Sequence, residues 1–174
     1  MIKLQLDPTK EYGIVLEGGG AKGAYQVGAW AALLEAGIKI KGIAGTSVGA
    51  LNGALMCMDD LREAEKLWDN ISWSQVMDID DTLIEQWKAR DFSSLSLHEL
   101  LAEGKRILKD RGLDITPLKQ LIERTIDEDK IFQSDKEFFV STISLSDRKP
   151  LIVNMKEVAE GEMKDMLLAS AYLP

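Results

Sequence analysis

The sequence has 174 residues, with 29 acidic and 21 basic side chains and a formal net charge of -8. This length fits one domain with a single core, and 45% hydrophobic with 29% charged residues excludes a disordered chain. The acidic balance argues against a nucleic-acid-binding protein, which needs clustered Lys and Arg, and weakens attraction to an anionic membrane surface. A single cysteine excludes an internal disulfide, and no export signal or membrane-spanning run is evident, so we expect a cytoplasmic protein.

The first sixty residues predict two strand–helix units. An apolar run over 12–16 predicts a buried strand, and helical spacing of apolar residues predicts a helix over 23–36. A second short strand is expected over 41–44, followed by a helix of small and apolar residues over 48–58. Because a strand–helix–strand connection joins parallel neighbours, this part predicts an α/β fold with a parallel sheet.

The remaining chain predicts a helical insertion followed by further strands. Helix-start signatures stand at three places: Asp60 with Glu63, Ser96 with Glu99, and Thr116-Pro117. Irregular structure is expected over 71–95 and a solvated loop over the charged run 127–130. Strands are expected over 138–145 and 151–154 across an Asp147-Arg148 turn, with a last helix over 160–169. The predicted architecture is three-layer α/β, with a mostly parallel central sheet, flanking helices and a helical insertion.

Two glycine motifs follow the first two predicted strands. The first is Gly18-Gly19-Gly20-Ala21-Lys22-Gly23, and the second is Gly45-Thr46-Ser47-Val48-Gly49. The carboxyl ends of parallel strands meet at one edge of a sheet, which is where ligands bind in open α/β folds. Both motifs are therefore expected at the same edge.

The second motif has the Gly-x-Ser-x-Gly pattern of a nucleophile elbow. Such a turn is so tight that Ser47 takes a strained backbone conformation and Gly45 and Gly49 must be small. The Ser47 hydroxyl then stands at a helix N-terminus, where the Val48 N–H and the helix dipole can stabilise an oxyanion. The alternative is a plain glycine-rich turn with a capping serine.

The first motif by itself fits more than one ligand. It matches the dinucleotide pattern Gly-x-Gly-x-x-Gly, but the second strand lacks a terminal carboxylate for a ribose, and no Gly-Lys-Ser/Thr phosphate loop is present. Adjacent Gly18, Gly19 and Gly20 can instead present N–H groups to an oxyanion. Lys22 either adds positive charge there or is a solvated helix-start residue, and Gly23 begins the helix.

A serine nucleophile requires a base, which the pattern leaves open. The one histidine, His98, lies off the apolar stripe of its predicted helix, so we expect an exposed first-turn residue. A carboxylate whose pKa is raised by burial is the alternative base. Spacing alone singles out none of the aspartates.

Together the two motifs resemble the patatin-like phospholipase family. The match is close over 13–55, above all at 17–25 and 45–53, and 169–174 is similar to the family's Ala-Ser-x-x-x-Pro segment. The resemblance implies hydrolysis of lipid acyl esters by a Ser-Asp dyad, with Ser47 as the nucleophile and Gly18–Gly20 as the oxyanion loop. It implies no metal or cofactor, a lipid or acyl-ester substrate, and transient contact with a membrane surface.

One part of the family pattern is missing. The family's dyad Asp belongs to an Asp-Gly-Gly or Asp-Gly-Ala motif after the Ala-Ser-x-x-x-Pro segment, whereas no Asp-Gly occurs in this sequence. We therefore expect residues 1–174 to be an incomplete patatin-like catalytic domain, inactive or nearly so. Asp135, Asp147 and Asp165 are expected in turns or on the surface. The alternative is a non-catalytic module of the same fold that binds an acyl group or an anion.

The remaining candidates are large or sulfur-containing apolar side chains. They are Trp68, Trp73, Trp87, Met56, Met58 and Met77, which we expect in the core rather than in an acyl-chain pocket or at a lipid interface. Cys57 is expected to be a small buried hydrophobe.

Overall fold

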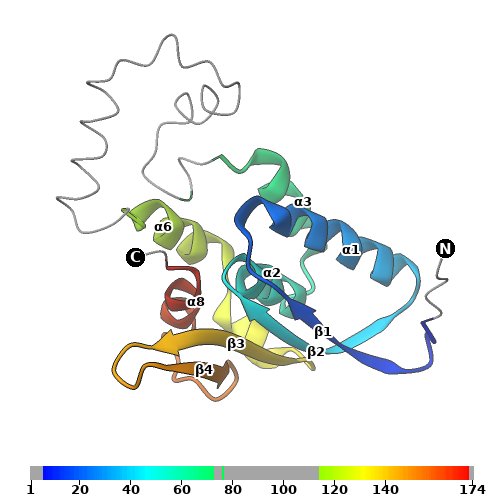
Figure 1. Cartoon of the computed structure of the whole chain (residues 1–174). Helices are drawn as coiled ribbons and strands as arrows, with labels where there is room; N and C mark the ends of the chain where they lie inside the picture. The colour runs from blue at the N-terminus through cyan, green and yellow to red at the C-terminus, as the bar shows by residue number, and fades with distance from the viewer. Residues whose placement is uncertain (1–5, 73–75, 77–113, 173–174) are drawn as a thin grey trace, which may run out of the picture.

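The computed structural model describes residues 6–72, 76 and 114–172, and within them a four-stranded sheet carries packed helices (Figure 1). The strands, in their spatial order, are β1 (Glu11–Leu16), β2 (Lys39–Thr46), β3 (Glu137–Ser144) and β4 (Lys149–Asn154). The first three run parallel, and β4 pairs antiparallel with β3 through a hairpin. The predicted mostly parallel sheet of an α/β fold is confirmed.

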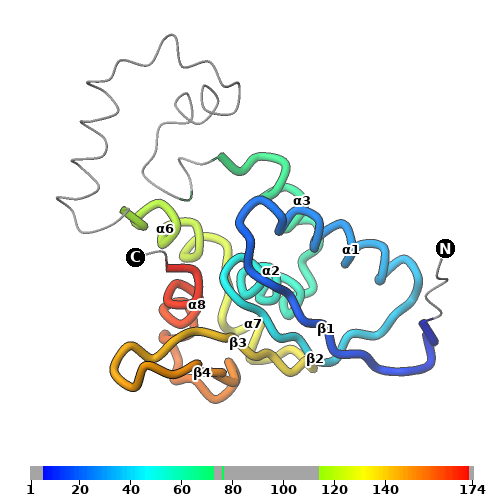
Figure 2. The backbone as a smooth tube through the Cα atoms, in the orientation of Figure 1, coloured from blue at the N-terminus to red at the C-terminus, as the bar shows by residue number. Residues whose placement is uncertain are grey.

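The helical elements follow the strands in chain order. They are the 3-10 turn η1 (Gly20–Lys22) and the helices α1 (Gly23–Glu35), α2 (Val48–Cys57), α3 (Leu61–Asn70), α6 (Thr116–Thr125), α7 (Glu128–Gln133) and α8 (Met163–Ala171). Helix α2 is central, because it contacts β1, β2 and β3 as well as α1, α3, α7 and α8 (Figure 2). None of the helices in the described part of the chain is long and apolar enough to cross a membrane.

The core lies between the helices and one face of the sheet. On that face Ile43, Phe138 and Val140 are almost completely buried. On the opposite face Val15 is 83% exposed and Ile152 is 70% exposed. This alternation of buried and exposed side chains is typical of a sheet with one packed face. The described residues thus form the sheet and one layer of helices, and the third layer of the predicted architecture is not seen among them.

Most described elements form close to their predicted positions. Helix α3 begins after Asp60, whose carboxylate accepts a hydrogen bond from the Glu63 N–H, as the capping signature predicts. Strand β2 extends two residues beyond the prediction at each end, and α8 begins three residues later than predicted. The predicted Ser96 helix lies outside the described residues.

One prediction of local structure is wrong. The charged run 127–130 is not a loop, because Asp127 caps α7 by accepting a hydrogen bond from the Lys130 N–H. Ile131 is fully buried and anchors this short helix in the core. A single buried side chain directly after a charged run is too weak a periodic signal to predict a helix.

Candidate active site

Ser47 occupies the sharp turn between β2 and α2. Its backbone has φ 55° and ψ -127°, a positive-φ conformation that costs a non-glycine residue about 1–3 kcal/mol. A side chain on Gly45 would place its Cβ 2.4 Å from the Gly49 carbonyl oxygen, and one on Gly49 would lie 2.3 Å from the Leu16 carbonyl oxygen. The turn is therefore packed backbone against backbone, which explains glycine at both positions.

The glycine loop between β1 and α1 passes directly beside Ser47. A Cβ on Gly18 would lie 3.2 Å from the Ser47 Cβ and 3.9 Å from its Oγ. Gly19 and Gly20 have φ values of 144° and 54°, which favour glycine over any other residue. The fold thus brings both sequence motifs together at one edge of the sheet.

The surroundings of the Ser47 hydroxyl favour negative charge. Val48 is the first residue of α2, so its N–H has no acceptor within the helix and lies at the positive end of the helix dipole. Lys22 is exposed in η1, and its aliphatic stem lies against Gly19. Such an arrangement can hold a carbonyl oxygen that gains negative charge.

Gly23 lets three helices meet behind the glycine loop. A side chain there would place its Cβ 2.3 Å from the Trp68 ring and 2.7 Å from the Val48 Cγ2. The start of α1 can therefore pack directly against α2 and α3. Trp68 is half-buried against the core, as predicted, and Met56 is buried. Trp73, Trp87, Met77 and His98 lie outside the described residues.

A polar network around the buried Asn52 supports the glycine loop, and no sequence motif indicates it. Asn52 is 2% exposed; its Nδ2 donates to the Gly23 carbonyl at 3.0 Å and to the Gln26 Oε1 at 2.9 Å. Its Oδ1 accepts from the Trp68 Nε1 at 2.9 Å, and the Gln26 Nε2 donates to the Glu17 carbonyl at 2.8 Å. The sequence offers one signal of this network, which is the polar Asn52 within the otherwise apolar helix predicted over 48–58.

Ser170 in the last turn of α8 also reaches the elbow. Its Oγ accepts a hydrogen bond from the Ser47 N–H at 2.9 Å and donates to the Ser141 carbonyl at 2.7 Å. The sequence placed Ser170 in a family-like segment but assigned it no role. The segment's last residue, Pro174, lies outside the described residues.

The three aspartates considered from the sequence have other partners or positions. Asp135 pairs with Lys41, whose hydrogen bond holds the pKa of that carboxyl below its usual range. Lys41, the partner of Asp135, precedes Ser47 by six residues of extended strand, a separation of about 20 Å. Asp135 is therefore held far from the nucleophile. Asp147 hydrogen-bonds to Ser144 in the exposed hairpin turn, and Asp165 lies exposed in the first turn of α8. These are the turn and surface positions expected, so the base stays unassigned.

Cys57 is the last residue of α2, at the opposite end of the helix from the elbow. Its side chain is buried, and this burial raises the pKa of the thiol to about 12. The thiol therefore stays protonated at neutral pH and packs as a small hydrophobe, as predicted.

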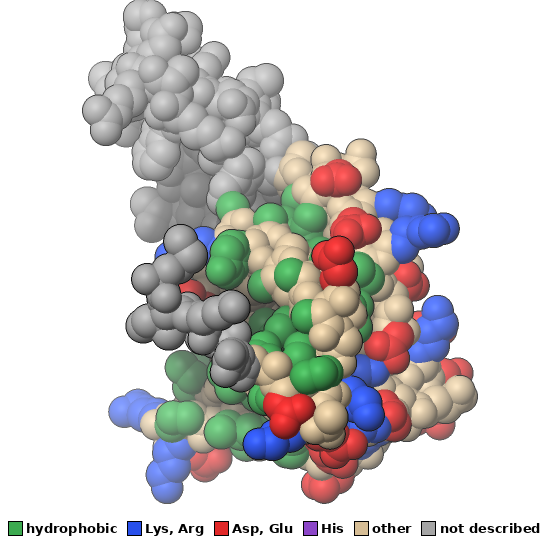
Figure 3. All heavy atoms as spheres, turned by 90° about the vertical axis from the view of Figure 1, so that its right-hand side faces the viewer, with side chains coloured by type: hydrophobic (Ala, Val, Ile, Leu, Met, Phe, Trp, Pro, Cys, Tyr) green, Lys and Arg blue, Asp and Glu red, His purple; other side chains and the backbone are tan. Residues whose placement is uncertain are grey.

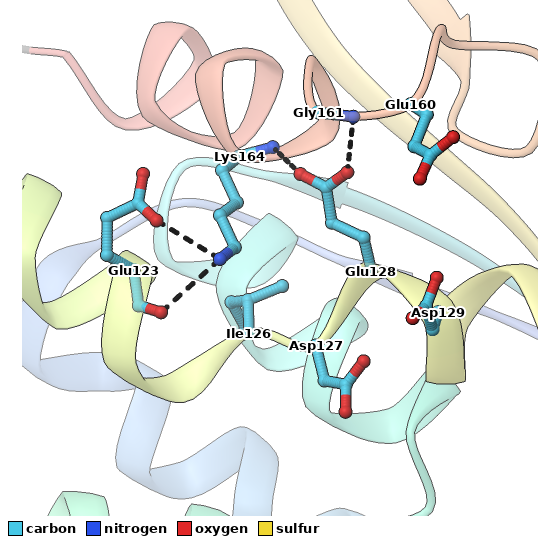
Figure 4. A pocket seen from close by; sticks show the side chains of 8 residues that line it. All are labelled: Glu123, Ile126, Asp127, Glu128, Asp129, Glu160, Gly161 and Lys164. Carbon is cyan, nitrogen blue, oxygen red and sulfur yellow. Dashed lines mark hydrogen bonds and ion pairs between the residues drawn. The ribbon is translucent and has the colours of Figure 1, made fainter.

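A surface pocket lies away from this site, at the N-terminal end of α8 (Figure 4). Its lining residues are Glu123, Ile126, Asp127, Glu128, Asp129, Glu160, Gly161 and Lys164. Figure 4 shows Glu128 accepting hydrogen bonds from the Gly161 and Lys164 N–H groups, while the Lys164 ammonium pairs with Glu123 at 3.1 Å. The pocket's polar groups thus hold α8 in place, at the opposite end of the helix from Ser170.

Charges of both signs are spread over the side of the molecule shown in Figure 3, with hydrophobic side chains exposed between them. This face therefore offers no uniformly basic surface of the kind that binds nucleic acid.

Comparison with known proteins places the chain in a family. The family model for patatin-like phospholipase matches residues 14–174. The chain therefore belongs to the patatin-like phospholipase family, which confirms the resemblance carried by the two glycine motifs.

Individual relatives match shorter stretches. The chain is 34% identical over 98 residues to the neuropathy target esterase sws of Drosophila persimilis, covering 52% of this chain and 7% of that protein. It is 58% identical over 50 residues to the lysophospholipase nte1 of Aspergillus terreus, covering 29% of this chain and 3% of that protein. The chain thus spans a small fraction of these relatives' length. The crystal structure of the type III effector protein ExoU aligns with 91% of this chain and 38% of its own, at 17% identity and a TM-score of 0.47.

Proposed function

We propose that this chain carries the nucleophile and oxyanion loop of a lipid acyl hydrolase. The observation that carries the proposal is the close approach of the glycine loop to Ser47, since a Cβ built on Gly18 would lie 3.2 Å from the Ser47 Cβ, at a turn that holds Ser47 in a strained conformation. Membership of the patatin-like phospholipase family supports a lipid ester as substrate, and the names of two relatives denote an esterase and a lysophospholipase. A cytoplasmic location with transient membrane contact belongs to the same proposal.

In the proposed reaction, the Ser47 Oγ attacks the ester carbonyl carbon and loses its proton to a base. The carbonyl oxygen becomes an oxyanion, which N–H groups of the Gly18–Gly20 loop and of Val48 stabilise at the start of α2. The intermediate collapses to an acyl-enzyme as the alcohol leaves with the proton. Water, deprotonated by the same base, then releases the fatty acid and restores Ser47.

The proposed base is the aspartate of an Asp-Gly segment, which forms a Ser-Asp dyad with Ser47. The 174 residues contain no Asp-Gly, so by themselves they supply the nucleophile and the loop but not this base. We expect the 174-residue chain alone to hydrolyse a lysophospholipid at or near the background rate. A longer form of the protein that includes an Asp-Gly segment is expected to be active, and Asp→Asn there should abolish the activity.

A fluorophosphonate probe tests the nucleophile in that longer form. Labelling and lysophosphatidylcholine hydrolysis should both be lost in Ser47→Ala. Both should persist in Ser144→Ala, which removes a hydroxyl at the end of β3 that is hydrogen-bonded to Asp147 of the hairpin turn. Equal labelling of the wild type and Ser47→Ala would refute the assignment. No labelling of either, together with binding of a fatty acid, would favour the non-catalytic binding module.

A further inference from the structure

The hydroxyl of Ser170 connects the nucleophile turn to the sheet. It accepts from the Ser47 N–H at 2.9 Å and donates to the Ser141 carbonyl at 2.7 Å. Ser141 lies opposite Thr46 in the β2–β3 ladder, so the hydroxyl bridges the two strands where β2 leaves the sheet. Ser170 and Ser47 are 123 residues apart in the sequence.

This hydroxyl determines which way the peptide between Thr46 and Ser47 faces. A serine hydroxyl has one proton, and here that proton is directed at the Ser141 carbonyl, so a lone pair is left for the Ser47 N–H. The Thr46 carbonyl of the same peptide faces the opposite side, 3.5 Å from the Cβ position of Gly18. Rotation of this peptide would break the Ser170 contact and turn an N–H toward the glycine loop.

The orientation of this peptide controls the backbone angle φ of Ser47. That angle is 55°, which is unfavourable for serine and must be held by surrounding contacts. The free energy of one partly buried hydrogen bond is similar in size to the free energy of such strain. Its loss is therefore enough to let the turn relax in part of the molecules.

We propose that Ser170 is a positioning residue, whose hydroxyl holds Ser47 in the conformation that presents its Oγ beside the glycine loop. Its effect on hydrolysis rests on the function proposed above, whereas its effect on the turn does not. Ser170 touches the Ser47 backbone and not the reacting atoms.

The test compares Ser170→Ala with two matched variants of the same interface. Ser170→Thr keeps a hydroxyl at this position. Thr142→Val removes the hydrogen bond from the Thr142 hydroxyl to the Ala169 carbonyl at 3.1 Å, which also ties β3 to α8 but does not reach the elbow. Thr142→Val therefore reports what loosening of α8 does by itself.

Two readouts separate positioning from simple destabilisation. By NMR of the ¹⁵N-labelled protein, the Ser47 amide should exchange with solvent about 5–10-fold faster in Ser170→Ala, with little change in the two matched variants. In a catalytically active form of the protein, Ser170→Ala should lower kcat by about tenfold with KM unchanged, and Ser170→Thr should restore most of it.

Unchanged Ser47 exchange in Ser170→Ala, or equal acceleration in Thr142→Val, would overturn the proposal. If Ser170→Ala does not fold, Ser170→Cys replaces the hydroxyl by a weaker hydrogen-bonding group of similar size. Faster exchange of the Ser47 amide in Ser170→Cys than in Thr142→Val then supports the proposal, and equal exchange overturns it. If exchange changes as expected but wild-type Ser47 does not react with a fluorophosphonate, the proposed function fails and the positioning role stands.

Discussion

Replacing Gly49 by alanine tests the packing of the nucleophile turn against β1. The new Cβ would lie 2.3 Å from the Leu16 carbonyl oxygen and 2.7 Å from the Glu17 carbonyl oxygen. The shorter distance is more than 1 Å below the 3.4 Å of an ordinary contact. Both obstacles are backbone atoms at the end of β1, where Leu16 pairs with Gly45, so they cannot move without disturbing the sheet.

The size of the effect follows from this geometry. Overpacking a well-packed site costs about 1–3 kcal/mol, and an obstacle made of backbone puts Gly49→Ala at the upper end, near 3 kcal/mol of unfolding free energy. For a protein of this size each kcal/mol lowers the melting temperature by about 2–4 °C, so a fall of roughly 6–12 °C is expected. The glycine loop should be displaced as well, because Glu17 precedes Gly18.

Two other helical glycines provide matched controls. Gly28 lies in α1, and among the described residues nothing beyond its own stretch of helix comes within 4 Å of its Cβ position, so Gly28→Ala should stabilise the protein by about 0.5–1 kcal/mol. A Cβ on Gly53 in α2 would lie 2.8 Å from the Phe138 ring, which is a side chain that can shift, so Gly53→Ala should have an intermediate effect.

Urea unfolding followed by tryptophan fluorescence measures all three variants, with free energies compared at equal m values. The expected order of stability is Gly28→Ala, then Gly53→Ala, then Gly49→Ala. If Gly49→Ala is as stable as Gly28→Ala, the inferred contact between the turn and β1 is wrong.

Three further predictions concern a helix cap, the buried network and the thiol. Asp60→Ala should lower the free energy of unfolding, measured in urea, by about 1 kcal/mol. Asp60→Asn keeps an acceptor for the Glu63 N–H and should lose far less stability. Equal losses in the two variants would contradict the cap. Asn52→Leu should lower the free energy of unfolding, measured by thermal denaturation, by about 1–3 kcal/mol, because it leaves the Trp68 N–H without its acceptor. In the Trp68→Phe background the same substitution should cost less. Additive effects of the two substitutions would argue against the network. Because burial raises the pKa of Cys57 to about 12, the unfolded thiol ionises near pH 8.5 while the folded thiol does not. Stability should therefore fall between about pH 8.5 and 12 by up to about 1.4 kcal/mol per pH unit more than in Cys57→Ala, and parallel pH profiles would refute the shift.

The sequence by itself determined the local elements and the candidate nucleophile. Strands and helices with clear periodicity formed where predicted, since residue spacing decides which side chains share a face. The Gly45–Gly49 pattern by itself specifies a tight turn, because only glycine tolerates the backbone contacts that such a turn makes. Helix α7 was missed because its single buried side chain, Ile131, makes no periodic pattern.

Only the tertiary structure decided what supports Ser47 and the glycine loop. The Ser170 hydroxyl meets the Ser47 N–H across 123 residues, and Asn52 joins α1, α2 and α3 through hydrogen bonds to Gly23, Gln26 and Trp68. The packing also decided that helices cover one face of the sheet in the described residues while Val15 on the other face stays exposed. Spacing along a chain encodes contacts within one element, whereas a hydrogen bond between distant elements depends on how the helices and strands pack together.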